Sequence, residues 1–112
     1  MNYKKIKITH NGKDYYAQFT PTTVKALDRT DFTFDRYASH PVTYVPKFFA
    51  ASLRACHPTI REALAEEILR GVKGKHALLE KLIGMYVDVM EEITDDPNDV
   101  APEDQSWGEV DE

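Results

Sequence analysis

The chain has 112 residues, enough for one domain and a terminal segment but too few for a second core. Hydrophobic residues make up 42% of it and charged residues 29%, which excludes a wholly disordered chain and favours a folded, water-soluble body. No apolar run approaches the roughly 20 residues that span a bilayer, and the charged start MNYKKIKITHNG has no apolar signal core behind it. We therefore expect a cytoplasmic protein that does not bind membranes.

Charge is distributed unevenly along the chain. The formal net charge is -5, but residues 95–112 hold 8 of the 19 acidic residues and none of the 14 basic ones, so residues 1–94 carry a balance of +3. Periodicity also stops at this point, and Pro97 and Pro102 interrupt the acidic segment. We predict a single globular domain over residues 1–94 and a disordered acidic tail over residues 95–112, because the tail has too little apolar surface to offset the entropy of ordering.

The first predicted element is a β-hairpin over residues 3–20. Two alternating segments flank Asn11-Gly12, the pair best suited to the positive φ angles of a two-residue type I′ turn. This turn pairs His10 with Lys13, Ile8 with Tyr15, Ile6 with Ala17 and Lys4 with Phe19. The apolar members of these pairs share one face, which helices must cover because a lone hairpin is marginal in water.

Helices are expected at about residues 22–30, 34–39, 44–57, 59–71 and 75–94. The first begins at Thr20-Pro21, where a hydroxyl can cap the free amides and proline costs little at the first position. Thr33 is expected to cap the second, with Phe34 and Tyr37 facing inward and Pro41 breaking the helix.

The third and fourth helices are predicted from Thr and Pro signals. Thr43 should cap the third helix, which tolerates Pro46 in its first turn and ends at His57 because Pro58 disfavours helical geometry before it. Thr59 and Glu62 match a capping box for the fourth helix.

Two further features belong to the fourth helix. One apolar row holds Ile60, Leu64 and Ile68, and Glu66 with Arg70 forms a supporting exposed pair. The sequence Gly71-Val72-Lys73-Gly74 is expected to end this helix.

The last predicted helix has an unusually wide apolar face. At about 100° per residue its polar positions cover about 120° and its apolar positions about 200°. The helix is then either packed from several sides in the core, the interpretation we favour, or partly exposed as a groove wall or interface. The elements together predict a mainly α, α+β fold, with an N-terminal β-hairpin packed on a small bundle of four to five helices.

The sequence gives no positive support for catalysis. Cys56 and His57 are adjacent on a helix, so their side chains diverge by about 100° and cannot form a nucleophile and base pair, and Cys56 is expected to be buried. A single cysteine excludes an internal disulfide and a structural zinc pattern, and the four histidines lack close ligand spacing. No Gly-rich phosphate loop is present. We predict no enzyme activity, no catalytic residues, no cofactor and no metal.

A basic hairpin face leaves nucleic-acid binding as an alternative. Lysines of the hairpin lie near aromatic side chains and could contact a phosphate backbone: Lys4, Lys5, Lys7 and Lys13, with Tyr3 and Tyr16. Lysines on an exposed strand also prevent edge pairing, and we favour that explanation because the acidic tail opposes polyanions.

The order of these elements resembles a known family. In chain order these are the NGK turn, FTPTTVKALDR, an aromatic-rich loop, YVPKFFAASLRACHP and LLEKLIGMYVDVMEEI. Together they cover about residues 3–93 and are similar to small tail assembly chaperones of long, non-contractile-tailed bacteriophages and prophages. The resemblance implies an assembly factor that binds the tape measure protein, keeps it soluble and recruits tail tube subunits. It also implies a location in the cytoplasm of the bacterial host and absence from the mature virion.

Two groups of residues are candidate partner contacts. Met85, Val89 and Met90 lie on the apolar arc of the last helix, where flexible Met side chains suit a helical client, although such residues also fill core gaps. In the acidic tail, Trp107 could anchor in a basic pocket of a partner or of this body, with Asp104 and Glu109 steering it. The alternative is a solubilising tail with an incidental Trp. Apolar faces that seek a client also lead us to expect dimers or higher rings.

Overall fold

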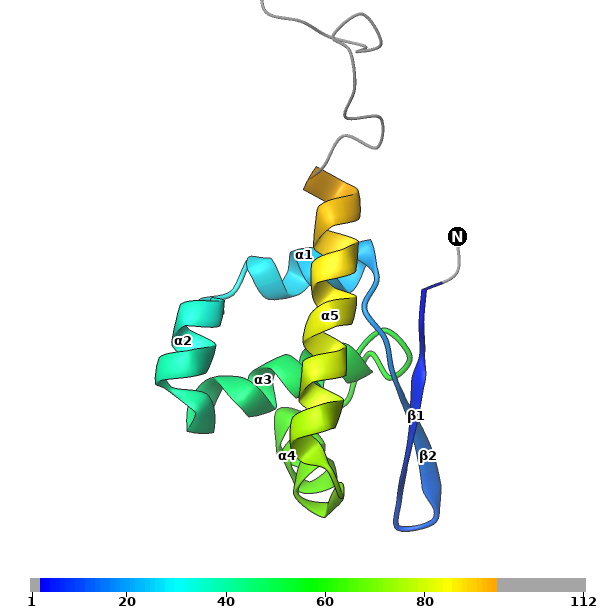
Figure 1. Ribbon diagram of the computed structural model, residues 1–112. Helices are drawn as coiled ribbons and strands as arrows, with labels where there is room; N and C mark the ends of the chain where they lie inside the picture. Colours follow the sequence, from blue (N-terminus) through cyan, green and yellow to red (C-terminus); the bar gives the residue numbers. More distant parts are fainter. Residues whose placement is uncertain (1–2, 95–112) are drawn as a thin grey trace, which may run out of the picture.

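The computed structural model describes residues 3–94, so the predicted disordered tail lies outside the described residues. A two-stranded antiparallel hairpin is followed by five helices within this range, which confirms the predicted mainly α, α+β class (Figure 1). The elements in chain order are β1 (Ile6–His10), β2 (Lys13–Ala17), α1 (Pro21–Asp28), α2 (Phe34–Ser39), α3 (Pro41–Leu53), α4 (Glu62–Gly71) and α5 (Lys75–Thr94).

The hairpin has the predicted turn and register. Asn11 and Gly12 have φ angles of 52° and 76°, as a type I′ turn requires at both central positions. The paired residues are His10 with Lys13, Ile8 with Tyr15 and Ile6 with Ala17, which confirms three of the predicted pairs. The predicted partners Lys4 and Phe19 lie beyond the paired strands.

The outer edge of β2 is attached to the end of α3. The backbone N–H of Gln18 donates to the carbonyl of Ser52 at 2.7 Å, and the N–H of Tyr16 donates to Nε2 of His57 at 3.1 Å. These amides point away from β1, because in this register Tyr16 belongs to a pair that exchanges no hydrogen bonds. The hairpin is therefore held through its main chain as well as through its apolar face.

The first two helices begin at the predicted caps. Thr20 Oγ1 accepts from the N–H of Thr23 at 3.3 Å, and Thr33 Oγ1 accepts from the N–H of Arg36 at 3.0 Å. Phe34 and Tyr37 are half-buried and pack against the core, as predicted.

The predicted bounds of α3 are wrong at both ends. The helix begins at Pro41, with His40 as its N-cap, rather than at residue 44 with a cap at Thr43. Pro41 separates α2 from α3 but also occupies the first turn of α3, where its missing N–H costs nothing.

A specific contact explains why α3 ends before the predicted residue His57. Helix continuation would require the carbonyl of Ser52 to accept from Cys56, but it accepts from Gln18 of the hairpin connection instead. The N–H groups of Cys56 and His57 both turn to the carbonyl of Leu53, so the helix ends there rather than at His57.

The start of α4 also differs from the prediction. The helix begins at Glu62 with Arg61 as N-cap, and the predicted capping box of Thr59 and Glu62 does not form. A turn in which Ile60 N–H donates to the carbonyl of His57 occupies the expected first residues. The predicted pair of Arg70 and Glu66 is confirmed at 2.5 Å.

The core lies between the hairpin and the helices, with α5 running along its length (Figure 1). An aromatic cluster fills its centre: the Phe48 ring lies 5.2 Å from that of Phe19 and 5.9 Å from that of Tyr86. α5 has the predicted bounds, and four of its side chains are buried: Leu82, Met85, Tyr86 and Val89.

Candidate functional site

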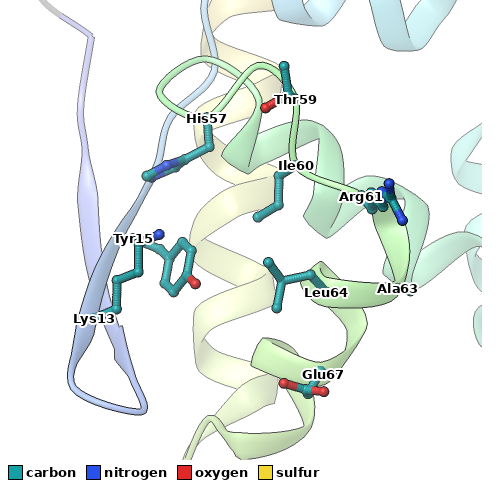
Figure 2. Close-up of a pocket in the computed structure, with 9 residues that line it drawn as sticks. All are labelled: Lys13, Tyr15, His57, Thr59, Ile60, Arg61, Ala63, Leu64 and Glu67. Carbon is teal, nitrogen blue, oxygen red and sulfur yellow. The ribbon is translucent and has the colours of Figure 1, made fainter.

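A groove lies between the hairpin and the first turns of α4, and we call it the hairpin groove (Figure 2). Its volume is about 590 Å³, within the range of small-ligand and peptide pockets. The residues that line it come from β2, the α3–α4 connection and α4: Lys13, Tyr15, His57, Thr59, Ile60, Arg61, Ala63, Leu64 and Glu67.

The floor of the hairpin groove is apolar. Ile60 and Leu64 point across it toward Tyr15, and His57 closes one end (Figure 2). Tyr15 is buried in the core, whereas Leu64 keeps 37% of its surface exposed. A molecule bound in the groove would therefore contact the exposed Leu64 side chain on one side and the Tyr15 ring on the other.

His57 is fixed in place by the hairpin. Its Nε2 accepts the Tyr16 N–H, so this nitrogen is unprotonated when the bond is made. Its ring lies 5.3 Å from the Tyr15 ring and stacks on the Tyr16 ring at 6.5 Å with an interplanar angle of 8°. These contacts position the His57 ring as a wall of the groove.

The rim of the groove carries more positive than negative charge. Lys13 Nζ lies 5.3 Å from the centre of the Tyr15 ring, and Arg61 is on the α4 side. Glu67 is the acidic lining residue, and its Oε2 lies 3.4 Å from Nε2 of His10. No side chain caps α4, so its first amides, beside Ala63 and Leu64, leave a partial positive charge at the groove, which Glu62 in the same turn opposes.

The tip of the hairpin approaches the end of α4 closely. A Cβ atom added to Gly71 would lie 3.3 Å from Nδ1 of His10, tighter than ordinary van der Waals contact. His10 therefore contacts α4 at both Glu67 and Gly71.

A second candidate surface follows α5. Next to its buried face is a row of half-buried apolar side chains that ends in Ile93, which is 41% exposed. We call it the α5 row: Leu79, Ile83, Val87, Met90 and Ile93. One side of the wide apolar arc of α5 therefore packs in the core, and the other side remains partly exposed to solvent.

The predicted partner residues do not share one open surface. Met85 and Val89 are in the core at 7% and 4% exposure, and they border a small cavity of about 170 Å³ beside Tyr3. Met90 is half-buried and borders a hollow of about 210 Å³ between α1 and the end of α5. The tail candidates Asp104, Trp107 and Glu109 lie outside the described residues.

The burial of Cys56 differs from the prediction. Cys56 is half-buried rather than buried, and its Sγ lies 3.9 Å from Oε1 of Gln18. Over residues 3–94 no group of three or more His, Cys, Asp or Glu side chains is placed to hold a metal ion. Within the same range no helix is long and apolar enough to cross a bilayer.

The hairpin groove was not predicted from the sequence. It brings together residues far apart in the chain, and its shape depends on α3 ending at Leu53 and on the turn before α4. The one sequence signal was the row of Ile60, Leu64 and Ile68. In the structure Ile68 is fully buried while Ile60 and Leu64 remain at the groove.

Comparison with known proteins gives one family. A family model described as a domain of unknown function, DUF5055, matches residues 1–108. No curated protein and no solved structure matches the chain.

Proposed function

The chain belongs to the DUF5055 family, whose function is unknown, and we propose that it is a tail assembly chaperone that binds the tape measure protein of a long-tailed phage or prophage. In this role it keeps the client soluble and helps to recruit tail tube subunits in the host cytoplasm. The observation that carries the proposal is the α5 row, a partly exposed apolar surface on the longest helix.

The dimensions of the α5 row suit a helical client. From residue 79 to residue 93 the row spans about 21 Å at ~1.5 Å per residue, the length of about four helical turns. An amphipathic helix can lie against such a surface with its own apolar residues at every third or fourth position. Met90 and the exposed Ile93 provide adaptable and accessible contacts at one end of the row.

The resemblance to tail assembly chaperones supports the same class of partner. It rests on the order of the hairpin, the aromatic loop and the final helix, and that order is present in the structure. The chemistry required is that of a binding protein rather than of an enzyme, so the proposal needs no catalytic residue or cofactor.

Co-expression with a tape measure protein tests the proposal. We expect soluble client and a recoverable complex with the wild-type chain, and loss of both with Val87→Asp, because the new carboxylate would be desolvated against the client's apolar face. The matched control is Gly84→Asp, which adds the same charge to the polar face of α5, where a new Cβ meets no atom within 4 Å. Client solubility that is unchanged by the wild-type chain would contradict the proposal.

Self-association follows from the same surface. In the absence of a client, α5 rows of two copies can bury each other, so we propose dimers or higher rings at high protein concentration. Light scattering should show Val87→Asp shifting the mass toward the monomer and Gly84→Asp leaving it unchanged. A monomeric wild-type chain at high concentration would contradict this part of the proposal.

A nucleic-acid-binding regulator is the second candidate. The specific observation is that Lys7 lies opposite Tyr16 on the outer face of the hairpin, where both side chains are exposed. This function predicts salt-dependent binding that is lost on changing Lys5 and Lys7 to Glu. Absence of a gel shift at low salt would exclude it.

A further inference from the structure

The hairpin groove has an apolar floor, a basic rim and an uncapped helix end, and the proposed function uses none of them. We propose that this groove binds the chain's own acidic tail, with Trp107 inserted between the hairpin and α4. The inference does not rest on the tape measure client, because it concerns a contact within one chain.

The floor of the groove suits an aromatic anchor. A Trp side chain buries about 150–250 Å² and prefers aliphatic and aromatic surroundings. Leu64 is exposed at 37% although it lies beside Tyr15 and Ile60, so the floor is an apolar surface open to solvent over the described residues. Trp107 is the only tryptophan of the chain and stands in a segment with few other apolar side chains.

The charges of the tail and of the groove rim are complementary. Trp107 is preceded by Asp104 and followed by Glu109, and the tail as a whole holds 8 acidic residues and no Lys or Arg. The groove presents Lys13 on the hairpin side and Arg61 on the α4 side. The uncapped amides of α4 add partial positive charge, Glu62 in the same turn opposes it, and the acidic lining residue Glu67 lies with its Oε2 3.4 Å from Nε2 of His10. An acidic segment therefore suits this rim better than a basic or neutral one.

The number of residues between Thr94 and Trp107 is large enough to span the distance to the groove. α5 is about 30 Å long at ~1.5 Å per residue, and α4 lies beside the end of α5 opposite Thr94 (Figure 1). The first turns of α4 line the groove. The chain from Thr94 to Trp107 can extend about 43–47 Å at ~3.3–3.6 Å per residue. The tail can therefore return along α5 to the groove of its own chain with length to spare.

Fluorescence of the full chain tests the proposal directly, because all Trp emission comes from Trp107. We expect blue-shifted emission and weak acrylamide quenching in the wild type. Leu64→Asp should shift the emission to that of a solvated indole and raise quenching severalfold, because it places a carboxylate on the floor beside an acidic occupant. Wild-type emission already typical of a solvated indole would overturn the proposal.

The controls separate docking in the groove from other effects. Val42→Asp makes the same kind of change at a side chain that is 88% exposed on α3, outside the groove lining, and should leave the emission blue-shifted. Lys13→Glu tests the rim without altering the floor and should raise quenching, whereas Lys25→Glu on α1 should not. Blue-shifted emission that survives both Leu64→Asp and Lys13→Glu would place Trp107 elsewhere and overturn the assignment.

Dilution distinguishes the chain's own tail from that of a second copy. Docking within one chain predicts emission that does not change with protein concentration. A blue shift that appears only as concentration rises, together with a dimer mass in light scattering, would assign the occupant to a second copy and overturn the intramolecular proposal. The fluorescence experiment contains no client, so its failure would not argue against the chaperone function. Failure of the co-expression experiment would likewise not argue against docking of the tail.

Discussion

At the scale of single residues, Asp31 joins the connection after α1 to α3. Its carboxylate accepts from the hydroxyl of Tyr44 and from Nζ of Lys47, each at 2.8 Å, and Nη1 of Arg36 lies 3.5 Å from its Oδ2. The hydrogen bonds from Lys47 and Tyr44 lower the pKa of Asp31, because they stabilise its charged form. An exposed carboxylate thereby helps to hold the aromatic loop over the core.

Because the pKa of Asp31 is lowered in the folded protein, we expect the protein to lose stability as the pH falls. The stabilising effect of Asp31 is fully present above its unfolded pKa of about 3.8 and is lost as the pH falls through the lower folded value. Asp31→Asn should lower the melting temperature at pH 7, and the gap from wild type should close as the pH approaches 2. Thermal melts of both proteins across this range measure the effect. A gap that stays constant with pH would contradict the assignment.

At the scale of elements, local signals and tertiary contacts decide different boundaries. The hairpin register, the caps at Thr20 and Thr33 and the bounds of α5 were predictable, because each depends on residues close in sequence. The end of α3 was not, because the carbonyl of Ser52 is taken by Gln18, which is 34 residues earlier in the chain. The groove depends on that end, so its lining could not be assembled from sequence patterns.

A matched pair of glycine substitutions tests the turn of the hairpin. Gly12→Ala should destabilise the protein by about 1 kcal/mol, because its φ of +76° is costly for a residue with a Cβ. Gly84→Ala should stabilise it by about 0.5–1 kcal/mol, because Gly84 lies inside α5 with open space around a new Cβ. Denaturant unfolding of the two variants gives both values. Effects of the same sign would contradict the assigned conformations.

At the scale of the whole molecule, charge divides the chain into two parts. Residues 1–94 have a formal charge of +3, and the tail brings the total to -5. The buried core of the described residues is built from side chains between positions 8 and 89. This division of charge was visible in the sequence, whereas the proposed docking place of the tail could be named only once the structure showed the groove.

Removal of residues 95–112 should leave the fold in place. We expect the truncated chain to keep the helical circular dichroism of the full chain and to melt cooperatively, because the aromatic cluster and the hairpin contacts all remain. Its melting temperature should be slightly below that of the full chain at low salt, with a smaller difference at high salt, because salt screens the proposed contact between tail and rim. A truncated chain without cooperative melting would show that the tail belongs to the core.

The contact between His10 and Gly71 has a mechanical consequence. The tip of the hairpin rests on the last residue of α4, so the spacing between these two elements sets how wide the groove between them opens. A side chain at residue 71 would act as a wedge, because the 3.3 Å approach to Nδ1 of His10 forces the tip to give by a few tenths of an ångström. Gly71 is not among the residues that line the groove, so the aperture can be adjusted without altering the chemistry of its walls.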